Sequence, residues 1–188
     1  GLLTTDRVGN ALVCHWNHEN PQAQALEGLF RSSSEEVDED TVFANLKRWK
    51  APLLRERNSR KDLSLEETLG RALPLARQNP VVACAWPVAL AKNLPGANFG
   101  ELVLVGRRCG EKRALGFLLT LTSRLLRQDS LQRLAGPLRD SRAKKTEDFF
   151  RMPQGKRARR LAEENTPALA KRWGFRMSPR LHIWLWGA

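Results

Sequence analysis

The chain has 188 residues, of which 32 are Lys or Arg and 20 are Asp or Glu, so its formal net charge is +12. Apolar residues make up 41% of the chain, which excludes a disordered tail. The longest apolar stretch, 81–91, is too short to cross a bilayer, so no membrane is expected as a partner. A chain of this length forms one domain, or one domain with a small appendage.

The charge is distributed unevenly along the chain. Residues 1–46 contain two basic and eight acidic side chains, whereas residues 47–188 contain 30 basic and 12 acidic ones. We therefore expect an N-terminal segment, 1–40, with an acidic loop at 31–40, followed by a basic helical domain, 41–188, that ends in an apolar strand. This asymmetry indicates a polyanionic partner. A general Arg excess is the alternative, because 23 Arg against 9 Lys agrees with a compositional bias.

The N-terminal segment contains two predicted elements. Residues 11–16 fit a short strand, and Asn20-Pro21 marks the start of a helix that runs to about Phe30. The acidic loop, RSSSEEVDED, has the composition of a solvated segment.

Helical periodicity begins at residue 42 and continues to about residue 128. After a helix near 42–49, Ser64 and Glu67 form a capping box that opens a helix ending at Gln78. The segment 79–93 is apolar on nearly every face, which predicts a helix at the centre of a bundle that Pro87 kinks or splits. Residues 101–108 fit a helix or a buried strand.

The clearest helix covers 111–128, and Gly116 inside it permits close packing of a neighbour. One face of this helix is predicted to be apolar, including Leu125 and Leu126. Asp129 marks the cap of a further helix, 138–160 forms a basic connector, and a helix runs from about Lys156 to Asn165.

The C-terminal part contains a short helix that starts at Thr166-Pro167, followed by an alternating strand at 181–186. We therefore predict a mainly α fold, a compact helical domain of about seven or eight helices with one or two short strands near the termini.

The basic side chains form the strongest candidate site, because clustered cations neutralise phosphates and the guanidinium fork holds a phosphate bidentately. The densest cluster, 139–160, has nine cations against three carboxylates, and residues 47–61 support it. The predicted nucleic-acid-binding residues are Lys47, Arg48, Lys50, Arg55, Arg57, Arg60, Arg139, Arg142, Lys144, Lys145, Arg151, Lys156, Arg157, Arg159 and Arg160.

Residues 156–160, KRARR, place four cations at the start of a predicted helix. Cations at a helix N-terminus oppose the helix dipole, so this arrangement is easier to understand if an anion binds there. A solvated helix start is the alternative.

Other chemistry has weaker support. Cys14, His15 and His18 are the local group of metal-type ligands, but zinc needs three or four ligands, and surface histidines at a strand end are the favoured interpretation. Four tryptophans lie near cations in the sequence and fit either base stacking or, more often in small helical domains, packing: Trp49, Trp173, Trp184 and Trp186. Signatures of phosphate loops, dinucleotide folds and hydrolases are absent from the sequence. No catalytic residue, metal or cofactor is expected.

We therefore expect a non-catalytic, cytoplasmic nucleic-acid-binding protein, RNA or DNA, that contacts the backbone and acts as a regulator or as a subunit of a nucleoprotein or defence-type assembly. The alternative is a protein-interaction module, such as an antitoxin, immunity protein or adaptor, that uses Trp184, Trp186 and the acidic segment 35–40. A weaker alternative is a metal-dependent nuclease using Cys14, His15 and His18.

Overall fold

The computed structural model describes residues 3–8, 11–17, 19–23, 38–53, 61–139, 146–151 and 155–177. The chain divides into two units, Gly1–Val37 and Asp38–Ala188. The division of function between an acidic segment and a basic domain stays a prediction.

The first unit contains an antiparallel hairpin. β1 (Leu3–Val8) pairs with β2 (Ala11–Trp16), and the register places Leu3 opposite Trp16. The strand predicted at 11–16 is therefore confirmed. Asn20 caps the helical turn at 21–23, because its side chain accepts a hydrogen bond from the Gln22 N–H at 2.9 Å. The rest of that predicted helix lies outside the described residues.

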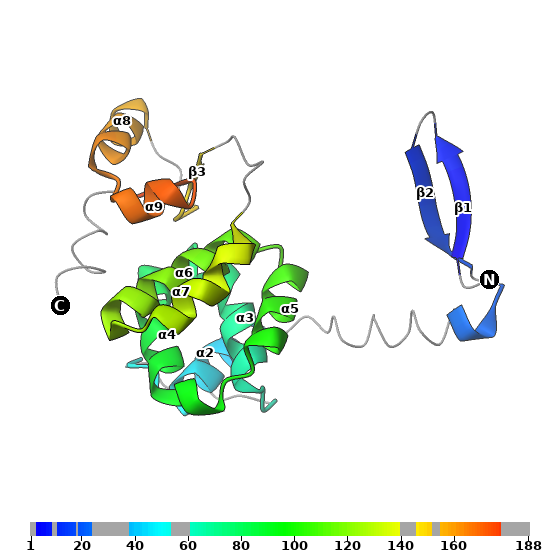
Figure 1. Cartoon of the computed structure of the whole chain (residues 1–188), viewed down its shortest axis with the longest axis horizontal. Helices are drawn as coiled ribbons and strands as arrows, with labels where there is room; N and C mark the ends of the chain where they lie inside the picture. Colours follow the sequence, from blue (N-terminus) through cyan, green and yellow to red (C-terminus); the bar gives the residue numbers. More distant parts are fainter. Residues whose placement is uncertain are drawn as a thin grey trace. The chain divides into compact units, whose positions relative to one another are not determined.

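Helices make up most of the second unit (Figure 1). In its described residues the bundle contains α2 (Glu39–Arg48), α3 (Leu65–Ala76), α4 (Pro80–Asn93), the 3-10 turn η1 (Leu94–Gly96), α5 (Phe99–Arg108), α6 (Lys112–Leu126), α7 (Asp129–Ala135) and the 3-10 turn η2 (Gly136–Leu138). The C-terminal part contains β3 (Glu147–Asp148), α8 (Lys156–Asn165), α9 (Ala168–Arg172) and β4 (Phe175–Arg176). The predicted mainly α fold with about seven or eight helices is confirmed.

Side-chain caps define the helix starts in the bundle. The Ser64 hydroxyl accepts a hydrogen bond from the Glu67 N–H, and the Asn79 side chain accepts one from the Val81 N–H. Asp38 caps α2 by accepting from the Thr41 N–H at 2.6 Å. The predicted acidic loop 31–40 was wrong at its end, because residues 38–40 form the cap and first turn of α2, where carboxylates favour the helix dipole.

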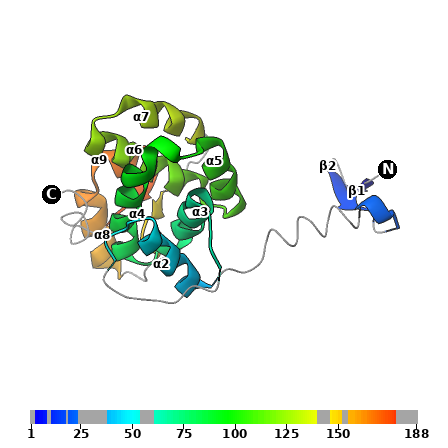
Figure 2. The ribbon, with the colours of Figure 1, turned by 90° about the horizontal axis from the view of Figure 1, so that it is seen from below.

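The centre of the bundle is formed by α4 and α6. Figure 2 shows both helices enclosed by the others, and α4 packs against α3 and α6. In α6 the ten residues Ala114–Ser123 are all buried, so this helix is covered on every side rather than on one face as predicted. Leu125 and Leu126, which were assigned to that face, are exposed at its end.

The structure decides two predictions that the sequence left open, the helix or strand at 101–108 and the effect of Pro87. Residues 101–108 belong to α5, so the strand alternative is wrong. Pro87 lies inside α4 without splitting it, because α4 continues to Asn93. Neighbouring buried residues, including Trp86 and Leu90, hold the helix in place against the lost backbone hydrogen bond.

The C-terminal part packs on the bundle beside α6 (Figure 1). β3 and β4 form a short parallel pair with Glu147 opposite Phe175. Phe117 from α6 lies against Phe149 and Phe175, with ring centroids 5.0 and 5.7 Å away. The predicted basic connector 138–160 is therefore wrong for residues 146–151, where Phe149 and Phe150 belong to the core.

Candidate nucleic-acid interface

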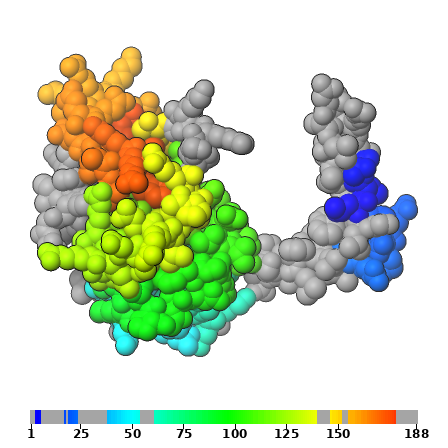
Figure 3. Space-filling model, in the orientation of Figure 1, coloured from blue at the N-terminus to red at the C-terminus, as the bar shows by residue number. Residues whose placement is uncertain are grey.

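The first turn of α8 carries the predicted cluster KRARR, and all four of its cations are exposed. Figure 3 shows α8 at the surface with its side chains projecting outward. In the described part of the chain, Arg160 pairs with Glu164 at 3.1 Å, while Lys156, Arg157 and Arg159 have no carboxylate partner.

The backbone at the start of α8 adds unsatisfied donors. Gly155 occupies the N-cap position and supplies no side-chain hydrogen bond, and no acidic residue lies in the first turn. The first amide groups of a helix have no partner within the helix, and the dipole places partial positive charge there. Four cations thus stand where the backbone is already electropositive, as the sequence predicts.

The cations at the end of α2 lie elsewhere. Lys47 and Arg48 are in the last turn of α2, where they favour the dipole, and Lys50 follows with a φ of 64°. Arg48 pairs with Asp62 at 3.0 Å and lies 5.6 Å from the centre of the Trp49 ring. Figure 1 shows α2 on the opposite side of the bundle from α8, so the structure does not combine these cations with the α8 cluster.

The remaining predicted residues divide into two groups. Arg139 is exposed after η2, and Arg151 is half-exposed with its side chain paired to Glu111. Arg55, Arg57, Arg60, Arg142, Lys144 and Lys145 lie outside the described residues.

Arg77 forms a buried ion-pair centre that the sequence analysis missed. Its side chain is 8% exposed and donates to Glu111 at 3.1 Å and to Glu147 at 3.2 Å. It also donates to the backbone carbonyls of Phe149 and Asp148. Nearly every donor of this guanidinium is used, which offsets the cost of burying the charge.

Further arginines extend this centre toward α8. Arg113 pairs with Glu147, and Arg176 pairs with Asp148 at 2.6 Å and with Glu163 of α8. The hydrogen bond that the Arg176 guanidinium donates to the Asp148 carboxylate raises the pKa of that guanidinium. The partners are up to 72 residues apart in sequence, so no local pattern indicates them.

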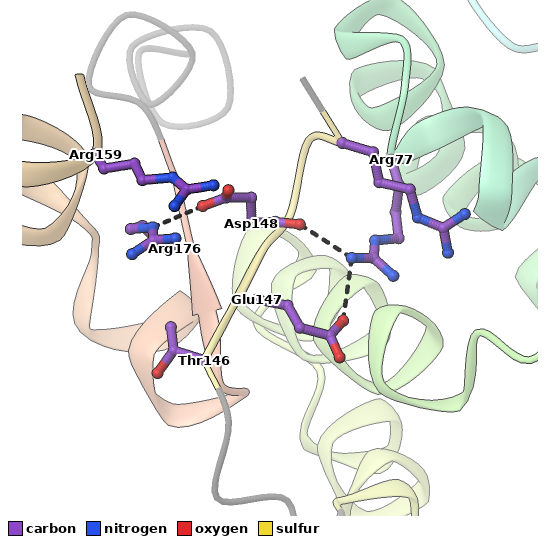
Figure 4. Close-up of a pocket in the computed structure, with 7 residues that line it drawn as sticks. Arg77, Thr146, Glu147, Asp148, Arg159 and Arg176 are labelled. Carbon is purple, nitrogen blue, oxygen red and sulfur yellow. Dashed lines mark hydrogen bonds and ion pairs between the residues drawn. The ribbon is translucent and has the colours of Figure 1, made fainter. Parts of the chain in front are cut away.

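A pocket of about 430 Å³ opens beside this network (Figure 4). Four arginines, two carboxylates and a threonine line it: Arg77, Arg151, Arg159, Arg176, Glu147, Asp148 and Thr146. Figure 4 shows Arg159 reaching from α8 toward Asp148, and Arg176 meeting Asp148 from β4. The pocket therefore connects the interior ion pairs with the exposed cluster.

Trp49 and Trp173 make contacts within the second unit. Trp173 is 5% exposed, so it is too buried to stack on a base. Trp49 is partly exposed and donates from its ring nitrogen to the Leu63 carbonyl at 3.3 Å. Trp184, Trp186 and the strand predicted at 181–186 lie outside the described residues.

The residues of the predicted metal site belong to the first unit. Cys14 and His15 lie on β2 opposite Thr5 and Thr4, and His18 is outside the described residues. Across the described ranges, no three His, Cys, Asp or Glu side chains are grouped as metal ligands. The helices of those ranges include none that is both long and apolar enough to span a membrane.

Comparisons with known proteins add no information on this interface. No family model, curated protein or solved structure matches this chain. The arrangement itself provides exposed, uncompensated cations on α8 and free amides at its start, beside a pocket lined with arginine. Such groups bind phosphate oxygens without reading base edges.

Proposed function

We propose that this protein binds nucleic acid through phosphate contacts made by the first turn of α8, as a regulator or as a subunit of a nucleoprotein assembly. The observation that carries the proposal is that Lys156, Arg157 and Arg159 are exposed and have no carboxylate partner in the described residues. Each contact of a cation with a phosphate releases a counterion, which favours binding at moderate salt.

The position of these cations supports a bound anion. At a helix N-terminus they oppose the dipole, and each such placement costs a few tenths of a kcal/mol to about 1 kcal/mol at an exposed site. A phosphate at this position accepts hydrogen bonds from the free amides and from the guanidinium groups at once. The unfavourable placement in the free protein thus becomes favourable in the complex.

An Arg surplus caused by composition alone does not require this placement. The arginines of the interior, such as Arg77 and Arg113, are paired with carboxylates and have a structural role. Those of the α8 start are neither buried nor balanced by acids within their own turn. The proposal therefore concerns α8 and not the whole excess of +12.

Charge reversal tests the proposal. The triple variant Arg157→Glu, Arg159→Glu, Arg160→Glu is compared with the native protein in a fluorescence anisotropy titration with a single-stranded oligonucleotide, in RNA and DNA form. A matched control, Arg107→Glu, Arg124→Glu, Arg133→Glu, changes the net charge equally at exposed positions at the ends of α5, α6 and α7. We expect the α8 variant to lose binding and the control to keep most of it.

A salt titration gives the second readout. For the native protein, log K should fall linearly with log salt, with each α8 cation contributing about one to the slope. A native protein without affinity at low salt, or a slope near zero, contradicts the proposal. So does a control variant that loses as much affinity as the α8 variant.

A further inference from the structure

The pocket beside α8 contains one arginine more than its ion pairs require. Arg77, Arg113, Arg151 and Arg176 are balanced by four carboxylates, Glu111, Glu147, Asp148 and Glu163. Arg159 is the fifth arginine of this ion-pair region; it lines the pocket and has no carboxylate partner among the described residues. The pocket therefore has uncompensated positive charge at its α8 side.

A second cation belongs to the same side of α8. Lys156, Arg159 and Glu163 are spaced three and four residues apart, so they share one face of the helix. Glu163 contacts Arg176, which places this face toward β4 and the pocket. Lys156 is exposed and, like Arg159, has no carboxylate partner in the described part of the chain, so this face of α8 has two uncompensated positive charges, of which Arg159 lines the pocket.

Donors also remain available inside the pocket. Arg151 uses one terminal nitrogen on Glu111, and its side chain is 49% exposed. A guanidinium has five N–H donors, so Arg151 retains donors for a ligand, and the Arg159 side chain makes no hydrogen bond to another described residue. Two planar forks with free donors match the oxygens of a phosphate group.

From these contacts we infer that the pocket binds the terminal phosphate of a nucleic-acid strand, which rests on the nucleic-acid binding proposed above. A phosphomonoester has a charge of about −1.5 to −2 at neutral pH, close to the two uncompensated cations, whereas an internal phosphodiester has one charge. The pocket volume, about 430 Å³, lies within the range of small-ligand sites, about 300–1,000 Å³, so an end group with its sugar fits inside.

Two further cations next to the pocket are available to the rest of the nucleic-acid strand. Arg157 and Arg160 are exposed on the same turn of α8 but do not line the pocket. A strand that inserts its terminal phosphate beside Arg159 passes these two cations as it leaves. Backbone affinity and end recognition are thus assigned to different residues of one helical turn.

The test compares end-phosphorylated and hydroxyl-ended versions of one single-stranded oligonucleotide by fluorescence anisotropy. One pair differs at the 5′ end and a second pair differs at the 3′ end, with the dye on the opposite end each time. The proteins are the native chain, Arg159→Ala and the matched control Arg157→Ala, which removes the same charge outside the pocket. Circular dichroism melting checks that all three fold equally.

We expect a terminal phosphate at one of the two ends to tighten binding to the native protein about tenfold, the value of one strong charge-assisted contact. Arg159→Ala should abolish this difference in affinity. Arg157→Ala should weaken binding to both oligonucleotides but preserve the difference between them. Equal binding of all end forms overturns end recognition and leaves the proposed function intact. A preference that survives in Arg159→Ala also overturns the inference. Absence of binding to every oligonucleotide contradicts the proposed function and the inference together.

Discussion

Gly116 and Trp173 are in direct contact, and this contact joins the end of α9 to α6. A Cβ atom on Gly116 would lie 2.3 Å from the Trp173 ring, so no side chain fits between them. The prediction that Gly116 permits close packing is confirmed. The partner is a tryptophan 57 positions later in the sequence, which the helical pattern of α6 does not indicate.

Replacing Gly116 by Ala should destabilise the protein, although Ala is the better helix former by about 1 kcal/mol. The added methyl group forces the Trp173 ring to move in a close-packed site, at a cost of about 1–3 kcal/mol. Urea unfolding measures the change in the free energy of unfolding. Gly136→Ala is the control, because a Cβ there meets nothing within 4 Å and the backbone is right-handed helical, so it should stabilise by about 0.4–1 kcal/mol. Equal midpoints for the two variants would contradict the packing argument.

Removing the buried guanidinium should have a larger effect. Arg77→Met leaves Glu111, whose side chain is 3% exposed, with its charge only partly compensated. Breaking a buried ion pair costs about 3–5 kcal/mol, and chemical denaturation should show a loss of that size. The exposed pair of Arg48 and Asp62 provides the comparison, because Arg48→Ala should cost less than about 1 kcal/mol. Similar losses in the two variants would mean that burial does not decide the strength of these pairs.

Cys84 and Cys109 should react slowly with alkylating reagents. Burial raises the pKa of the Cys84 thiol, and burial is also the largest cause of the raised pKa of the Cys109 thiol. A raised pKa leaves less thiolate at a given pH, so the pH at which alkylation reaches half its maximal rate should exceed that of free cysteine. Site-resolved mass spectrometry measures each rate. In urea both midpoints should fall to that of free cysteine, and unchanged midpoints would exclude burial as the cause.

The N-cap of α8 offers a substitution with opposite effects on stability and binding. Gly155 has a φ of −64°, and a Cβ there meets nothing within 4 Å, so Asp fits this position. Gly155→Asp caps the free amides and complements the dipole, which should stabilise the helix by a few tenths of a kcal/mol to about 1 kcal/mol.

The same variant should bind nucleic acid more weakly, because the new carboxylate occupies the amides and pairs with the neighbouring cations. Thermal melting and anisotropy titrations measure the two effects. Gly155→Ala is the control, since it introduces neither charge nor cap and should leave affinity nearly unchanged. Stronger binding by Gly155→Asp would contradict a phosphate site at the start of α8.

The sequence was informative wherever the signal was local. Helix starts at Ser64 and Asn79 need only a capping side chain three or two residues before the amide that it binds, so both were predicted correctly. The start of α8 at Lys156 and the exposure of its cations likewise follow from nearby residues. Periodicity did not decide between helix and strand for 101–108, since both bury apolar residues.

Only the tertiary structure shows which side chains from distant parts of the sequence are in contact. The apolar stripe of α6 was visible in the sequence, but its burial on all sides depends on Trp173, Phe149 and Phe175 arriving from the C-terminal part. The pocket depends on Arg77, Glu147 and Arg159, which are far apart in the sequence and come together only in the folded chain. The sequence by itself thus determined the helices and the cationic turn, because those depend on neighbours along the chain. Which arginines are balanced in ion pairs and which remain available for an anion was decided only by long-range contacts between helices.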